Sequence, residues 1–153
     1  MNREGKVVKE LVKNIEIFMQ KNAKGIIRLS GTSHKLEIFA VDPVPIISLA
    51  KLLDKEVKGI VAKPDQTVDR LTFSLILGKL IPKDTIKEVY INKMDPSTKL
   101  IFAEVEANGR KISVIPTVGI FLAKAINIPL YMDTEICETL EHLKKQYDRS
   151  FAT

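Results

Sequence analysis

Few side chains in this sequence of 153 residues have the type and spacing for acid–base or metal chemistry. The two histidines, His34 and His142, fall on different predicted elements, so neither has a second histidine nearby and both are interpreted as surface residues. Glu104 and Glu106 alternate on one predicted strand, and Glu37 belongs to another. Paired carboxylates bind Mg²⁺ in many proteins, but glutamates that alternate along an exposed strand usually face solvent. No metal site follows from them alone.

The single cysteine, Cys137, excludes an internal disulfide and is typical of a reducing compartment, so we expect a cytoplasmic protein. Its helical spacing with Ile136 and Leu140 predicts a small buried side chain. We expect neither secretion nor membrane insertion, because the N-terminus lacks a signal pattern and no apolar run reaches the ~20 residues of a membrane-spanning helix. The sequence has no phosphate-binding loop, dinucleotide fingerprint or nucleophile elbow.

The elements that would position a site are organised around one strand–helix–strand unit. Residues 110–115 alternate as a strand does, whereas residues 118–126 are apolar on nearly every side of a helix. A helix of this kind is buried. We expect Thr117 to cap it, Asn127 to end it, and residues 128–131 to form a short final strand.

This unit has a counterpart earlier in the chain. A shift of 73 residues places residues 41–51 over residues 114–124, and Val, Pro, Ile, Leu, Ala and Lys coincide. With a slip of one further residue, residues 12–17 match residues 86–91. Because the order of predicted elements agrees in both halves, we predict an α+β fold of duplicated β-β-β-α units, with helices packed between or against antiparallel or mixed sheets.

A chain of this length is typical of one domain. We predict a single domain over residues 1–153, made of repeat 1 at about 8–56, a linking helix at about 67–81, repeat 2 at about 85–131 and a C-terminal helix at about 134–148. Duplication would bury Ala50 and Ala123 at equivalent positions of two helices.

Three local signals concern strands and helix ends. The N-terminal apolar spacing fits a helix over residues 5–13, but the match with the second half favours a strand over residues 8–20, which we predict. Asn108–Gly109 between alternating segments is typical of a two-residue β-hairpin. Asp133 or Thr134 is placed to cap the last helix.

The charge balance permits an anionic partner without requiring one. The formal net charge is +5 and the isoelectric point is near 9.3, but the lysines are scattered along the chain. Aromatic residues make up 6% and tryptophan is absent, which argues against a platform for stacking bases. Weak, sequence-independent binding to nucleic acid is the expectation from composition.

Four segments match, in order, motifs of a known domain family. Residues 36–41 before an apolar helix are similar to L-P-I-W-I-G, residues 71–75 to L-T-H-D-L, and residues 114–123 to A-R-P-S-D-A-I-A-L-A. Residues 128–131 fit the I-P-I-F-type strand that follows. Over nearly the whole chain the sequence resembles the bifunctional nuclease domain family. The resemblance implies a duplicated β-β-β-α fold and hydrolysis of phosphodiester bonds in RNA and DNA.

The polar residues of those motifs are largely replaced here. Phe73 and Ser74 stand where the family has His and Asp, and Ile115 and Val118 stand where it has Arg and Asp. Phosphodiester hydrolysis needs a metal or cation to neutralise developing charge and a base or metal to produce hydroxide. The residues present cannot supply these groups, so we expect cleavage to be weak or lost.

The remaining candidates for a catalytic or phosphate-binding role are Asp69, Arg70, Thr72, Ser74 and Thr117. Asp69 and Arg70 precede the linking helix, and helix N-termini attract anions. Thr72 and Thr117 keep or conservatively replace the residues of the family motifs. No cofactor is identified, and cleavage, if retained, would require Mg²⁺ or Mn²⁺.

Two functional hypotheses follow. The first is a nuclease of the bifunctional nuclease type, and the alternative is a non-catalytic oligomeric or nucleic-acid-binding scaffold of the same fold. We also expect a homodimer, because residues 128–131 and the last helix offer more apolar surface than one small domain covers.

Overall fold

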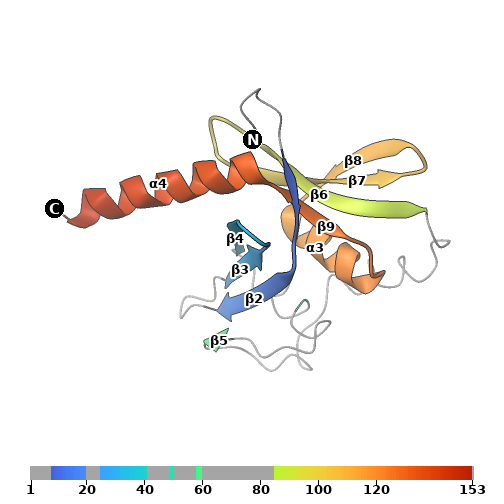
Figure 1. Ribbon diagram of the computed structural model, residues 1–153, viewed down its shortest axis with the longest axis horizontal. Coiled ribbons are helices and arrows are strands. Elements are labelled where there is room, and N and C mark those ends of the chain that lie inside the picture. The colour runs from blue at the N-terminus through green and yellow to red at the C-terminus, as the bar shows by residue number, and fades with distance from the viewer. Residues whose placement is uncertain (1–7, 20–24, 41–48, 50–57, 60–84, 153) are drawn as a thin grey trace.

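The computed structural model describes residues 8–19, 25–40, 49, 58–59 and 85–152, which form an α+β fold (Figure 1). Two helices pack on a mixed five-stranded sheet, and three antiparallel strands form a second, smaller sheet. The predicted α+β class is therefore confirmed. The linking helix predicted at residues 67–81 lies outside the described residues.

The larger sheet is built around an antiparallel meander. Its strands, in spatial order, are β1 (Lys9–Leu11), β9 (Leu130–Asp133), β6 (Ile86–Met94), β7 (Ile101–Ala107) and β8 (Arg110–Val114). The strand β9 returns parallel to β6, and β1 runs antiparallel to β9. The sheet is therefore mixed, with β1 and β8 at its edges.

The smaller sheet has a similar order. Its antiparallel strands are β2 (Asn14–Met19), β3 (Gly25–Ser30) and β4 (Lys35–Ala40). The two-residue strand β5 (Lys58–Gly59) pairs parallel to β2 at the edge. In both sheets, the described strands thus comprise a meander of three and a later strand parallel to its first member.

The predicted N-terminal strand over residues 8–20 is wrong in one respect, because the chain divides it between the two sheets. The amide of Val12 donates to the carbonyl of Leu130 at 2.8 Å, whereas the amide of Lys13 donates to Ser30 at 2.7 Å. The Val12 side chain is buried. Two residues suffice for the crossing because each amide finds an acceptor in a different sheet. The helical alternative is not adopted by residues 9–11.

The Asn108–Gly109 hairpin is confirmed. These two residues join β7 to β8 and have positive φ angles of 51° and 75°. A type I′ turn requires this backbone conformation at both central positions, and asparagine and glycine adopt it most readily.

The helix α3 (Pro116–Ala125) begins one residue before the predicted cap, so the assignment of Thr117 as N-cap is wrong. Ile115 is the N-cap, with an extended backbone and no side-chain hydrogen bond, and Pro116 occupies the first turn. Proline is suited to that turn because its missing amide hydrogen would have no helical partner. Asn127 ends the helix as predicted, with a φ of 56°. The amide of Ile128 then donates to the carbonyl of Ala123 at 2.9 Å, as in a glycine-type helix end.

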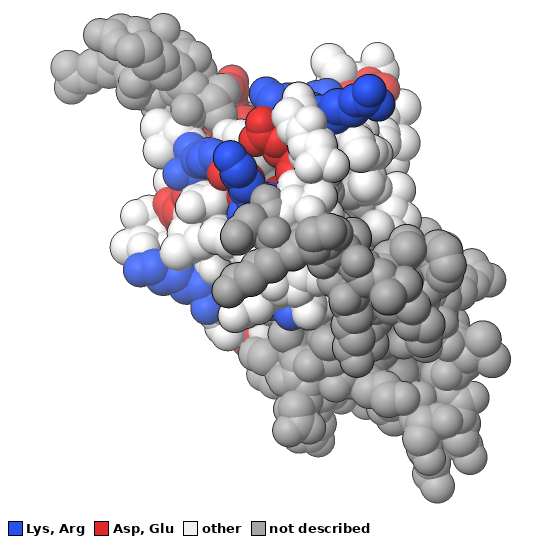
Figure 2. Space-filling view, turned by 90° about the vertical axis from the view of Figure 1, so that its right-hand side faces the viewer, with Lys and Arg blue, Asp and Glu red and all other residues white. Residues whose placement is uncertain are grey.

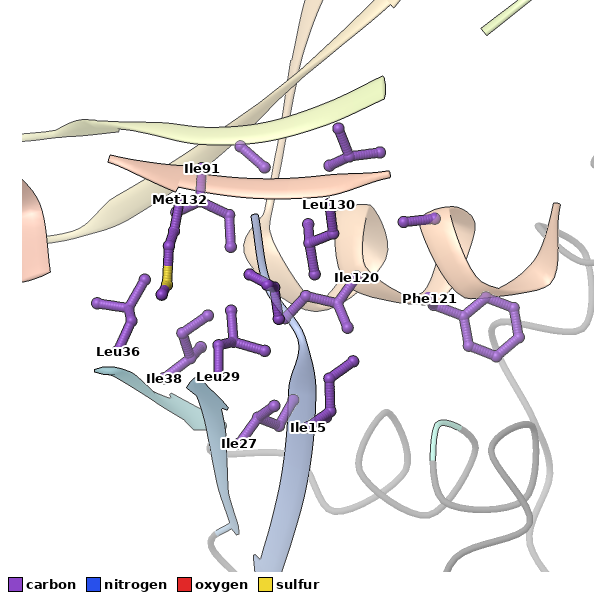
Figure 3. Close-up of a cluster of buried hydrophobic side chains, with 14 of the residues drawn as sticks. Ile15, Ile27, Leu29, Leu36, Ile38, Ile91, Ile120, Phe121, Leu130 and Met132 are labelled. Carbon is purple, nitrogen blue, oxygen red and sulfur yellow. The ribbon is translucent and has the colours of Figure 1, made fainter. Parts of the chain in front are cut away.

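The hydrophobic core lies between the two sheets and against α3. Figure 3 shows Leu130 and Met132 of the larger sheet facing Leu29 and Leu36 of the smaller one. On α3, Ile120, Phe121 and Ala123 complete the same cluster. Ala123 is fully buried as predicted, whereas Ala50 lies outside the described residues. Since one cluster draws on both sheets, neither sheet has a core of its own.

The last helix, α4 (Thr134–Ala152), follows β9 directly, contacts β4 of the smaller sheet and then extends beyond both sheets (Figure 1). The Asp133 carboxylate accepts a hydrogen bond from the Glu135 amide at 2.8 Å, which makes Asp133 the cap among the two residues predicted. Within the described part of the chain, no helix combines the length and apolarity needed to cross a membrane.

Close packing of α3 on the larger sheet gives a first prediction. An added Cβ at Gly119 would lie 3.0 Å from Cγ1 of Val89 and 3.1 Å from Cβ of Ala103. We therefore expect Gly119→Val to lower the free energy of unfolding by ~1–3 kcal/mol through overpacking. Gly119→Ala should change it less, because higher helix propensity offsets part of the strain. Denaturant titration measures both, and a valine variant as stable as the parent would contradict the contact.

Candidate functional site

Of the five sequence-derived candidates, only Thr117 belongs to the described residues. Asp69, Arg70, Thr72 and Ser74 lie outside the described residues. Thr117 is half-buried in the first turn of α3.

At the start of α3, the two positions where the resemblance implies polar groups are apolar. Ile115 is 56% exposed, and Val118 is partly buried and packs against the core. This helix also has no acidic residue in its first turn. The described part of that motif therefore offers neither an acid nor a base.

A different surface brings chemically useful side chains together. One face of the larger sheet covers the core, and residues on the opposite face form a row from β1 to β8. Cα pairing aligns, in order, Leu11, Tyr131, Tyr90, Glu104 and Ser113. Directly paired residues in a sheet point to the same side. We call this side the open face.

The aromatic part of the open face is organised around Lys9. Its ammonium group lies 4.7 Å from the ring centroid of Tyr131 and 5.2 Å from that of Tyr90, within the range of cation–π attraction. Lys9 also forms an ion pair of 2.6 Å with Glu88. Burial, and then the negative charges of Asp133 and Glu88, raise the pKa of Tyr90 to about 12. Its phenol therefore stays neutral and able to donate a hydrogen bond at physiological pH.

The polar part of the open face is organised around Glu104. Lys93 lies 3.3 Å and Lys111 3.9 Å from its carboxylate oxygens, and the Asn92 amide donates to it at 3.4 Å. The Oδ1 atom of Asn92 is buried and accepts no hydrogen bond from the described residues. Glu106 follows Glu104 on the same side of β7, next to Lys111 on β8. Glutamates thus balance the lysines of this face.

The side of the molecule seen in Figure 2 has the same mixed character. Lysine, arginine, aspartate and glutamate side chains are interspersed over its described part and do not gather into one basic patch. A surface of this kind attracts a polyanion through a few local contacts and not through a large uniform field.

Sequence reasoning missed the aromatic grouping. The low aromatic content argued against a stacking platform, yet Tyr90, Tyr131 and Phe102 all belong to the open face. The alternation of β6 and β7 contains this information, but only the pairing of β9 beside β6 brings Tyr131 next to Tyr90. The structure thus groups aromatic side chains that the overall composition did not indicate.

A second polar cluster joins three separate elements at His34, which the sequence suggested was an ordinary surface residue. Its Nδ1 lies 3.0 Å from Glu10 on β1, and its Nε2 lies 3.1 Å from Glu138 on α4. Glu10 also accepts hydrogen bonds from the backbone amides of Ser33 and His34. An added Cβ at Gly31 would collide with the Glu10 carboxylate, so glycine provides the space for this contact.

The cluster attaches α4 to the rest of the molecule. A second contact does the same, since Lys144 forms a 3.0 Å ion pair with Glu37, which also binds Arg28 at 2.8 Å. Glu37 thus belongs to the smaller sheet, away from Glu104 and Glu106, and these three glutamates do not form one site. Within the described residues, no three His, Cys, Asp or Glu side chains are placed to hold a metal ion.

Cys137 is buried at the base of α4, as its spacing predicted. Burial, reinforced by the nearby negative charge of Glu10, raises the pKa of its thiol to about 12. The thiol therefore remains protonated at neutral pH and is a poor nucleophile.

The His34 cluster makes stability depend on pH. The hydrogen bond to Glu10 raises the pKa of His34 above 6.5 despite partial burial. Burial raises the pKa of Glu10, but hydrogen bonds from the His34 ring and from the Ser33 and His34 amides outweigh it and hold the pKa below 4.5. The histidine contribution is complete below 6.5 and is lost as pH rises through the folded pKa, whereas the glutamate contribution is complete above 4.5 and is lost in acid.

We therefore expect His34→Gln to destabilise the protein most between pH 4.5 and 6.5, by ~0.5–1 kcal/mol, with a smaller difference at pH 9. Urea titrations at several pH values measure the difference. His142→Gln, at an exposed histidine on α4, serves as the control. A His34 effect that is constant from pH 5 to 9 would show that packing, and not charge, holds the cluster.

No protein-family model matches this chain, and no curated protein matches it. The chemistry of its own described residues is therefore the basis for assigning a function.

Proposed function

We propose that this protein is a non-catalytic scaffold, with a duplicated β-β-β-α fold similar to that of the bifunctional nuclease domain, that binds single-stranded nucleic acid weakly through the open face. The observation that carries the proposal is the grouping of Lys9, Lys93 and Lys111 with aromatic rings on the face of the larger sheet opposite the core. Lysines beside aromatic rings are the combination with which sequence-tolerant proteins hold single strands.

The arrangement of strands supports a duplication. In the second half, β6, β7 and β8 are followed by α3 and then by β9, parallel to β6. In the first half, β2, β3 and β4 are followed by a helical, buried Leu49 and then by β5, parallel to β2. The 73-residue shift relates Leu49 to Leu122 of α3. A common β-β-β-α-β unit accounts for both halves.

The contacts on the open face favour weak binding over tight binding. A phosphate that approaches Lys9 must compete with Glu88 at 2.6 Å, and one that approaches Lys93 or Lys111 must compete with Glu104. A base that stacks on Tyr90 or Tyr131 must displace the Lys9 ammonium from the ring. Each contact replaces an existing one, so the net gain is small.

Apolar residues at the start of α3 support the absence of cleavage. Ile115 and Val118 neither neutralise a developing negative charge nor activate water. The competing hypothesis, a functional nuclease, would depend on residues 69–74 together with Thr117. Thr117 is half-buried in the first turn of α3, and that turn contains no acidic residue.

Salt dependence tests the binding proposal. With three lysine–phosphate contacts, log Kobs for a single strand should fall against log salt with a slope of about −2, and the Kd should be ~10⁻⁴–10⁻⁶ M at physiological salt. Combining Lys93→Gln with Lys111→Gln should make the slope shallower by about 1.4. Fluorescence anisotropy with labelled homopolymers of different bases measures affinity and base preference.

The matched control combines Lys35→Gln with Lys145→Gln, which removes two exposed charges from β4 and α4. It should leave the slope within about 0.3 of the parent value. An equal loss of affinity in the two double variants would show that binding does not involve the open face. A salt-dependence slope near zero for the parent protein would reject the electrostatic mechanism.

The absence of cleavage is tested separately. Purified protein should leave labelled RNA and DNA intact with Mg²⁺ or Mn²⁺ present, because residues that act as a unit lose most of their effect when several are replaced. The control combines Thr72→Ala with Thr117→Ala, since contaminating nucleases would cleave equally in both preparations. Turnover by the parent that disappears in this control would reject the scaffold proposal and assign catalysis to the two threonines.

A further inference from the structure

The outer edge of the larger sheet is the surface with the most definite geometry for a partner. β8 is the last strand of the sheet, and no described strand pairs with its outer side. Four of its five residues are exposed, including Ile112, whose side chain is 51% exposed. An uncovered edge strand is a template for pairing with another strand.

The turn determines which backbone groups face outward. In a hairpin closed by a two-residue loop, the pair next to the loop, here Ala107 and Arg110, exchanges hydrogen bonds with each other. The direction of the backbone amide and carbonyl groups alternates from one residue of the strand to the next. Arg110, Ile112 and Val114 therefore direct these groups toward β7. The amide and carbonyl groups of Lys111 and Ser113 therefore point away from the sheet.

We propose that two copies of this chain pair antiparallel through β8, about a two-fold axis at Ile112, and join their sheets into one continuous sheet of ten strands. In this register Lys111 of one copy pairs with Ser113 of the other, and the pairing occurs twice by symmetry. Lys111 and Ser113 both have outward-facing backbone groups, so each Lys111–Ser113 pair forms two backbone hydrogen bonds. The two symmetry-related pairs therefore form four hydrogen bonds. Ile112 meets its own equivalent in the close, non-hydrogen-bonded position between them.

Side chains across this register are complementary. On the open face, the row would run Glu104, Ser113, then Lys111 and Glu106 of the second copy. Each lysine thus lies between acidic residues of both copies. On the opposite face, the two Ile112 side chains would cover one another and lose their exposure to water.

Other two-fold registers are unfavourable because of the side-chain charges and backbone directions described above. An axis at Lys111 would place two ammonium groups directly opposite each other, which is unfavourable. An axis at Ser113 would pair Lys111 with Ile115, whose carbonyl already accepts the Gly119 amide at 3.1 Å and leads into α3. If one β8 strand shifted by one residue along the other, residues with outward-facing backbone groups would pair with residues whose groups face β7. The hydrogen bonds between the two β8 strands would then be lost.

The contact differs from the one expected from sequence. That expectation relied on residues 128–131 and the last helix. Of these, Leu130 is buried between the sheets and Ile128 packs against the core. Ile112 and Ile115, at and just beyond β8, are two of the large hydrophobic residues that remain exposed in the described part of the chain. This proposal does not depend on nucleic acid binding and is tested in its absence.

Sedimentation equilibrium of the full chain between 1 and 500 µM is the first measurement. A short edge contact should give a dimer with a micromolar Kd, seen as a rise from 17.2 kDa toward twice that mass. Ile112→Glu would place two carboxylates opposite each other and should weaken the dimer at least tenfold. Its circular dichroism should match the parent, because Ile112 is exposed in the monomer.

Cross-linking tests the register. Ile112→Cys places two thiols at the two-fold axis, so mild oxidation should give a covalent dimer within minutes. Leu100→Cys, at a similarly exposed position before β7, should remain largely monomeric under the same conditions. A parent that stays at 17.2 kDa at 500 µM, an Ile112→Glu variant that dimerises normally, or equal cross-linking of the two cysteine variants would each overturn the proposal.

Discussion

The two sheets are held together by the short segment in which the N-terminal strand changes from one to the other. Val12 and Lys13 are adjacent, yet their amides bond to Leu130 in the larger sheet and to Ser30 in the smaller one. Because successive residues of a strand have opposite orientations, one step is enough to redirect the chain. The buried Val12 side chain anchors this crossing in the common core. Core packing, strand order and the position of α4 all depend on it.

A shared core makes the two sheets energetically dependent on each other. The side chains of β3 and β4 that cover the larger sheet would be exposed if that sheet separated. At about 25 cal/mol for each Å² of apolar surface, exposure of several such side chains would exceed the stability of a small domain. We therefore interpret the described parts of the chain as one cooperative unit, and the β1–β2 crossing is one covalent link between its two sheets.

The same crossing also positions the polar cluster at the base of α4. Glu10 is one residue before the end of β1, and its carboxylate reaches both the His34 loop and, through the His34 ring, α4. The open face, by contrast, depends on β9 lying between β1 and β6, because only then do Lys9, Tyr131 and Tyr90 meet. Both groupings bring together residues more than 20 positions apart in the sequence.

The sequence by itself determined the local features of this protein. Alternation predicted β7 and β8, Asn108–Gly109 predicted the hairpin between these two strands, and the apolar stretch before Asn127 predicted a buried α3. These features depend on backbone preferences and side-chain periodicity within about ten residues. The α+β class followed from their order along the chain.

Only the tertiary structure decided where residues from distant segments meet. The sequence did not reveal that β1 and β2 belong to different sheets, because an alternating pattern is the same whichever sheet buries it. Nor did it reveal the contacts of His34 or the grouping of tyrosines beside Lys9, since those depend on which strands become neighbours. Strand neighbours are selected by the fit of the whole core, and no single segment contains that information.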